Sequence, residues 1–119
     1  MNDDKARIEH MIEHSRRILT MLQDLNAEQF YGSRTLIEAV SFNFAVLGET
    51  ASKISGELRE KYPAIPWRII IGMRNFLIHD YVKAQPQYLW ETAQNDLPPL
   101  LVDLEAICRS LTSEGNPEK

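Results

Sequence analysis

The chain has 119 residues, of which 44% are hydrophobic and 25% are charged. This composition is typical of one globular domain with one core, and it argues against a second domain. The formal net charge of -4 excludes a general electrostatic attraction to nucleic acid, so any contact with a polyanion has to be local.

Two further features concern the cellular setting. The only cysteine, Cys108, cannot form an internal disulfide, and the first four residues lack the basic and apolar regions of a secretion signal. We therefore expect a reducing, cytoplasmic location. The longest apolar stretch, residues 69–73, is far too short to cross a bilayer, so no membrane insertion is expected.

The first half of the chain shows helical periodicity. Apolar residues recur at three- and four-residue steps over residues 3–25 and predict a long first helix. Residues 26–32 are interpreted as a connection. Ser33 is placed to cap a second long helix, which should falter near residues 55–56 and resume briefly over residues 57–61.

The next helix is predicted to begin after Pro66, whose missing N–H is not needed in the first turn. It should run over residues 67–79 and has almost no polar side. Its apolar residues are Trp67, Ile69, Ile70, Ile71, Met73, Phe76, Leu77 and Ile78. Since a helix that is apolar on most sides must be covered on most sides, we expect a second copy of the chain to bury part of it.

A last helical region is predicted to start at Pro86 and to end near Leu111. The two prolines at 98–99 should kink or restart it, with Asn95 or Asp96 as a cap. The sequence thus predicts an all-α fold, an antiparallel bundle of four to five helices. Its single domain should span residues 1–112, followed by a flexible tail over residues 113–119.

Three groups of residues are candidates for binding but have simpler interpretations. His10 and His14 with Glu13 match the H-x-x-E-H pattern of a class of zinc peptidases, but we expect both histidines to point to solvent and predict no metal site. Four scattered cations are interpreted as solvated side chains: Lys53, Arg59, Lys61 and Arg68. Four aromatic residues are interpreted as part of the core: Tyr62, Trp67, Tyr88 and Trp90.

Residues 74–81 concentrate polar side chains at the end of the most apolar helix, where they need partners or a purpose. Asn75 and His79 lie one turn apart, whereas Arg74 and His79 are about 140° apart around a helix. Arg74 and His79 therefore look to another chain or a ligand. The simpler interpretation pairs Arg74 with Asp80 or Glu49 and lets His79 cap the helix.

This run resembles the signature of the HepT-like toxins of the HEPN superfamily, which is Arg, four to six residues, His, any residue and Tyr. Arg74, His79 and Tyr81 fill it. The likeness extends to the preceding Ile65-Pro66-Trp67 and the following Asp96-Leu97-Pro98, and it spans most of the chain.

The resemblance implies a homodimer in which two Arg-His motifs face one cleft and cut RNA without a metal ion or cofactor. Arg74 would stabilise charge on the phosphate, and His79 from each copy would serve as base or acid. Asn75 would orient the imidazole or the phosphate. The resemblance also implies a nucleotidyltransferase antitoxin that transfers AMP to Tyr81, which would add negative charge beside the RNA cleft.

Two other interpretations stay open at this point. In the first, the chain is a non-catalytic helical partner of a nucleotidyltransferase. In the second, it is a structural dimerisation module. In the second case Arg74 and His79 would only satisfy each other across the two-fold axis.

Overall fold

A computed structural model describes residues 3–79 and 86–114 of the chain. These residues are helical almost throughout. In chain order the elements are α1 (Asp4–Leu22), α2 (Ala27–Tyr31), α3 (Arg34–Ser52), α4 (Gly56–Lys61), α5 (Trp67–His79), α6 (Pro86–Glu91), the π-helical turn η2 (Thr92–Asp96) and α7 (Leu97–Glu114).

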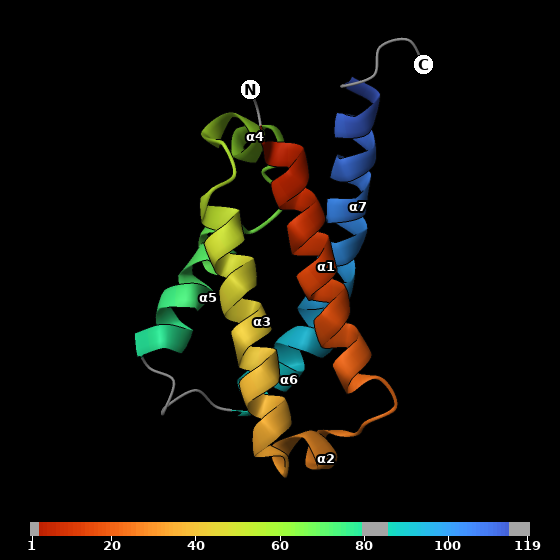
Figure 1. Cartoon of the computed structure of the whole chain (residues 1–119), viewed down its shortest axis with the longest axis vertical. Helices are drawn as coiled ribbons and strands as arrows, with labels where there is room; N and C mark the ends of the chain where they lie inside the picture. Colours follow the sequence, from red (N-terminus) through yellow and green to blue (C-terminus); the bar gives the residue numbers. More distant parts are fainter. Residues whose placement is uncertain (1–2, 80–85, 115–119) are drawn as a thin grey trace.

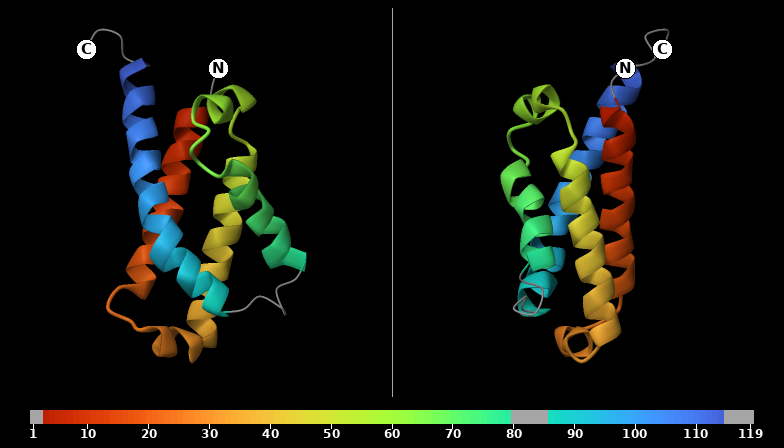
Figure 2. Two further views of the ribbon diagram at one scale, coloured as in Figure 1. Left: turned by 180° about the vertical axis from the view of Figure 1, so that it is seen from behind. Right: turned by 60° about the vertical axis from the view of Figure 1, so that its left-hand side comes forward.

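The four longer helices, α1, α3, α5 and α7, form an antiparallel bundle (Figure 1). Helix α3 packs against α1 on one side and against α5 on the other, and α1 also packs against α7. Figure 2 shows this arrangement from behind and from the side, with α5 at the edge of the bundle. The predicted all-α bundle is confirmed. No described helix is both long and apolar enough to span a membrane.

The core is built from apolar residues of all four long helices and of α2 and α6. Its largest fully buried members include Ile8, Met11, Ile18, Phe30, Phe44, Leu47, Leu89, Leu97, Leu104 and Ile107. Trp67 is buried as predicted, and its Nε1 donates a hydrogen bond to the carbonyl oxygen of Tyr62 at 3.0 Å. Trp90 packs beside Phe30, whereas Tyr88 is exposed.

The helix boundaries follow local capping. Ser33 caps α3 as predicted, since its hydroxyl accepts a hydrogen bond from the backbone N–H of Leu36 at 3.1 Å. The interpretation of residues 26–32 as a plain connection was wrong, because they contain α2. Asn26 and Gln29 form a reciprocal capping box there, which satisfies N–H groups that a short helix leaves exposed.

The N-terminus of α1 is tied to the start of α4. Asp4 is almost fully buried, and its carboxylate accepts hydrogen bonds from the backbone N–H and the hydroxyl of Ser55, at 2.9 and 2.6 Å. Ser55 in turn caps α4 by accepting from the N–H of Leu58. This clamp fixes the start of α4 against α1.

The predicted cap at Asn95 or Asp96 was wrong, whereas the expected kink or restart at the two prolines takes the form of a π-helical turn. Instead of a cap at Asn95 or Asp96, the chain stays helical through the π-helical turn η2 and enters α7 directly at Leu97. The N–H of Leu97 reaches the carbonyl oxygen of Thr92. Residues 98–99 then fall in the first turn of α7 and, because proline has no N–H, donate no hydrogen bond back to η2. Helix α7 extends to Glu114, two residues beyond the predicted end of the domain.

Candidate active site

The helix that carries the motif approaches α3 very closely at Gly48. A Cβ added there would lie 2.6 Å from the carbonyl oxygen of Ile70 and 3.1 Å from both N and Cβ of Arg74. Only glycine fits, because real Cβ atoms do not come so near a backbone oxygen. The close approach therefore sets the spacing of α3 and α5 at the level of Arg74.

Glu49, the residue after Gly48, forms an ion pair with Arg74. Its Oε1 lies 2.8 Å from Nε of Arg74, and each side chain is 43% exposed. Nη1 of Arg74 also donates a hydrogen bond to Oδ1 of Asn75 at 3.0 Å. A guanidinium has five N–H donors, so these two interactions fix its direction while using two of them.

The structure thus brings together two of the predicted site residues, Arg74 and Asn75, and pairs the arginine with Glu49. His79 is the last residue of α5, and its side chain lies outside the described part of the structure. Tyr81 and Asp80 lie wholly outside the described residues.

The helical register still constrains His79. Because α5 is helical from Trp67 through His79, residues 74 and 79 are separated by about 140° around its axis. The arginine and the histidine of one chain therefore belong to different faces of α5. Asn75, which is exposed, shares the face of His79 and at the same time contacts Arg74.

The surface of α5 around the motif includes exposed apolar area. Ile69 is 65% exposed, and an added Cβ at Gly72 would meet nothing within 4 Å. An apolar cavity of about 360 Å³ lies beside it, lined by Ile69, Ile70, Met73 and residues of α3, α6 and α7. Among the described side chains of α5, Ile69 is the large apolar one that is exposed, and with the open side of Gly72 it leaves room for contact with another molecule.

The two histidines of the H-x-x-E-H pattern do not both point to solvent, so that prediction was wrong. Asn43 Nδ2 donates to the carbonyl of Ala39 at 2.8 Å, which leaves Oδ1 to accept from Nδ1 of His14 at 2.7 Å. In the neutral pair, His10 Nε2 then donates to His14 Nε2 at 3.1 Å, and Thr50 donates to His10 Nδ1 at 3.0 Å. His14 is buried, and the network joins α1 to α3.

Sequence reasoning missed this network, although a signal for it exists. His14 lies three residues after Met11 and four before Ile18, which places it beside the apolar stripe of the first helix. Among the described residues there is no group of three or more His, Cys, Asp or Glu side chains that could hold a metal ion.

Comparison with known proteins gives a consistent set of relatives. Residues 11–107 match the family described as Ribonuclease HepT-like. Two proteins of Methanocaldococcus jannaschii, Putative RNase MJ0125 and Putative RNase MJ1216, are each 33% identical to the chain. The alignments cover 92% of this chain and 94% of the first relative, and 98% of this chain and 94% of the second.

A further relative, Probable ribonuclease HepT of Thermococcus cleftensis, is 29% identical over 81% of this chain and 87% of its own length. No solved structure matches the chain significantly.

Proposed function

Since the chain belongs to the HepT-like ribonuclease family, we propose that it is a toxin that cuts RNA as a homodimer, without a metal ion. The observation that carries the proposal is the Arg74 guanidinium, which Glu49 and Asn75 hold in one direction at a partly exposed position. A cation oriented in this way is suited to bind a phosphate with its other donors.

Two copies of the chain are needed for the proposed chemistry. Cleavage requires a base to take the proton of a 2′-hydroxyl and an acid to protonate the departing 5′-oxygen. The 2′-oxygen attacks phosphorus, and the bond from phosphorus to the 5′-oxygen breaks. His79 of one copy would serve as base and His79 of the other as acid, since imidazole titrates near neutrality.

In this arrangement Arg74 stabilises the charge on the pentacoordinate phosphorus, where an oriented donor is most effective. Asn75 contacts Arg74 and shares the face of His79. It would orient both side chains toward the same phosphate. The exposed Ile69 and the uncovered side of Gly72 support α5 as the surface that meets the second copy.

Regulation is the second part of the proposal. A nucleotidyltransferase antitoxin would transfer AMP to Tyr81, two residues beyond the end of α5. The adduct would place a phosphate and a nucleoside next to the RNA cleft of the dimer and would repel the phosphates of an RNA strand.

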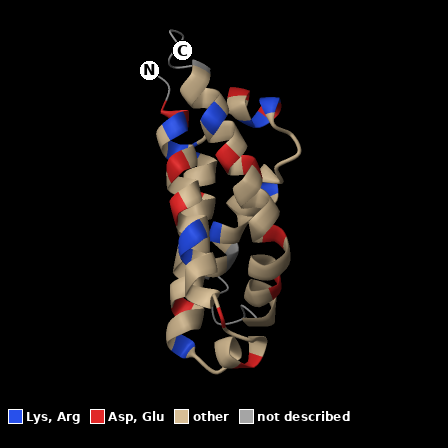
Figure 3. Ribbon diagram, turned by 90° about the vertical axis from the view of Figure 1, so that its right-hand side faces the viewer, with Lys and Arg blue, Asp and Glu red and all other residues tan. Residues whose placement is uncertain are grey.

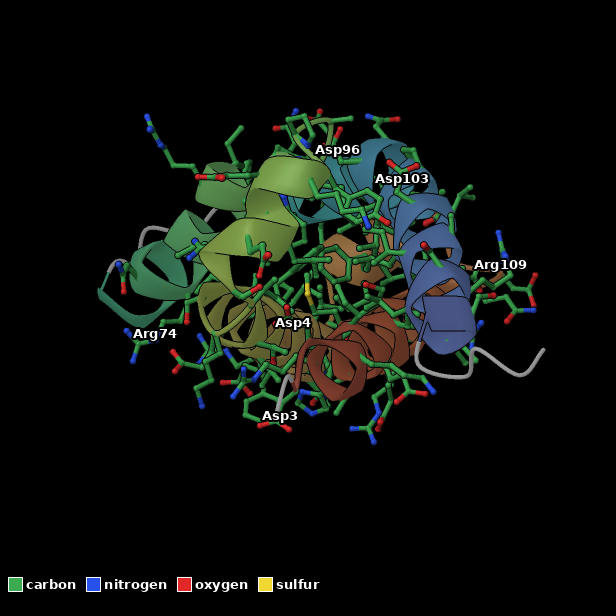
Figure 4. The ribbon with its side chains drawn as sticks, turned by 90° about the horizontal axis from the view of Figure 1, so that it is seen from above. Asp3, Asp4, Arg74, Asp96, Asp103 and Arg109 are labelled. Atoms are coloured by element: carbon green, nitrogen blue, oxygen red, sulfur yellow. The ribbon has the colours of Figure 1, made fainter. Side chains whose placement is uncertain are left out.

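The test is RNA cleavage by the purified protein in the presence of a metal chelator. Arg74→Ala and His79→Ala should each abolish cleavage while the helical circular dichroism signal and the dimer persist. Arg109→Ala removes an exposed cation from α7, on a different side of the bundle from Arg74 (Figure 4), and serves as the control. Cleavage retained by either motif variant would contradict the roles proposed for Arg74 and His79. Absence of cleavage by the unmodified dimer would favour the non-catalytic partner instead.

A further inference from the structure

A second group of cations lies next to Glu49, the ion-pair partner of Arg74. A cavity of about 490 Å³ opens between α1 and α3, and its lining includes Arg7, His10, Glu49 and Lys53. Glu49 therefore belongs both to this cavity and to the ion pair with Arg74. The cavity adjoins the candidate active site through one carboxylate.

Direct interactions link the cations into a row. Nζ of Lys53 lies 3.9 Å from Oε2 of Glu49, while Oε1 of the same carboxylate lies 2.8 Å from Nε of Arg74. Nη1 of Arg7 donates to the backbone carbonyl of Lys53 at 2.9 Å, which holds its guanidinium at the end of α3. In Figure 4, Arg74 and Asp3, another residue of the cavity lining, lie on the same side of the bundle.

The balance of charge along this row differs from that of the whole chain. Arg7, Lys53 and Arg74 face two carboxylates, those of Glu49 and Asp3, so the row has a positive excess in a chain whose formal net charge is -4. Elsewhere basic and acidic residues are interspersed, as the side of the molecule in Figure 3 shows.

The cations two to three turns farther along α1 provide a comparison. Arg16 pairs with Glu105 and Arg17 pairs with Glu13, so each guanidinium there has a carboxylate of its own. The ammonium of Lys53, in contrast, makes a loose ion pair with a carboxylate already held by Arg74, and its side chain is 60% exposed. A hydrated ammonium with so little compensation is available to a phosphate.

We propose that Arg7 and Lys53 form a subsite for backbone phosphates of the RNA strand, beyond the bond that is cut. This inference rests on the proposed function. The strand runs from Arg74 past Lys53 to Arg7, and the cavity between the two helices receives a ribose or base, with the ring of His10 in its wall. The subsite supplies the local attraction to RNA that the net charge of the chain does not provide.

The experiment measures binding separately from cleavage. The probe is a 2′-O-methyl oligoribonucleotide, which keeps the phosphates but lacks the attacking hydroxyl, and its affinity is measured over a range of salt concentrations. Lys53→Gln is the primary variant, because the backbone carbonyl that accepts from Arg7 stays in place. Arg7→Gln/Lys53→Gln is the second, and Arg16→Gln/Arg17→Gln removes the same number of cations from a later part of α1.

The double variant at the subsite should raise Kd about tenfold at moderate salt. It should also flatten the slope of log Kd against log salt by roughly 0.7 for each phosphate that the protein no longer neutralises. The weakening should be greater for a long oligonucleotide than for a dinucleotide, which spans only the motif. Lys53→Gln alone should show part of both effects.

Equal affinity and equal salt slopes for the subsite variants and the Arg16/Arg17 control would overturn the subsite while leaving the nuclease proposal standing. A second outcome is tight, salt-dependent binding that the subsite variants weaken, with no cleavage of natural RNA. It would contradict the nuclease proposal and support the subsite. Absence of RNA binding by the unmodified dimer would overturn both.

Discussion

Oε1 of Glu49 and Nε of Arg74 lie 2.8 Å apart, so a residue of α3 orients the arginine of the motif on α5. Each side chain is 43% exposed, and a pair of this kind contributes only about 0–1 kcal/mol to stability. The pair matters because it orients the guanidinium of Arg74. The carboxylate determines which of its N–H groups remain available to a phosphate.

Glu49→Gln should lower kcat/KM for RNA about 10- to 100-fold, because a guanidinium that turns away from the phosphate loses its orientation in the transition state. Glu13→Gln, which breaks an exposed ion pair with Arg17 on α1, is the matched control and should have full activity. Steady-state cleavage of a fluorogenic oligoribonucleotide gives both values. Equal activity of the two variants would contradict an orienting role.

Arg74→Lys keeps the positive charge but removes the planar fork that contacts Glu49 and Asn75 together. We expect kcat/KM to fall about 100-fold or more, with kcat affected more than KM, because oriented donors act mainly in the transition state. Arg109→Lys on α7 is the control. A lysine variant with nearly full kcat would show that charge alone is sufficient.

Gly48→Ala should destabilise the protein by about 1–3 kcal/mol, because the new Cβ would meet the carbonyl oxygen of Ile70 and force α3 and α5 apart. Urea unfolding followed by circular dichroism measures the change. Gly56→Ala is the control on α4, where an added Cβ also meets nothing within 4 Å, so that variant should be at least as stable as the parent. Identical midpoints for the two variants would rule out the close approach.

His14→Leu should cost about 2 kcal/mol, because it leaves Oδ1 of Asn43 without its buried donor. In a double-mutant cycle, His14→Leu/Asn43→Leu should lose less than the sum of the two single changes by about 1 kcal/mol, since neither leaves the other unpaired. Urea midpoints of the four proteins provide the cycle. Additive losses would mean that the two side chains do not interact.

AMP transfer to Tyr81 is tested by mass spectrometry of the protein coexpressed with the proposed nucleotidyltransferase antitoxin. The expected result is a mass increase in whole AMP units on the peptide that contains Tyr81, together with loss of RNA cleavage. Tyr81→Phe should remove the increase and retain cleavage in the presence of the antitoxin. An AMP adduct at another residue would contradict the assignment.

Local patterns predicted the helices well because caps and periodicity act over a few residues. Ser33 begins α3 and Pro66 precedes α5 as expected, since each satisfies a requirement of its own helix. The π-helical turn was not predictable in the same way. It arises where the first turn of α7 contains two prolines and the chain nevertheless stays helical from α6 onward.

The partner of Arg74 shows where prediction from sequence stops. Asp80 is near it along the chain and Glu49 is far away, and the sequence alone gives no reason to prefer one. Only the packing of α5 at Gly48 brings Glu49 within reach. The burial of His14 depends in the same way on Asn43, which a different helix supplies.

Each of four consecutive residues of α3 has a different role in packing. Leu47 is buried in the core, Gly48 admits the backbone of α5, Glu49 holds Arg74, and Thr50 donates to His10 of α1. Deleting or inserting one residue in this turn would rotate the rest of the helix by about 100° and would misdirect all of these interactions at once. This turn should therefore accept substitutions one at a time more readily than any change in its length.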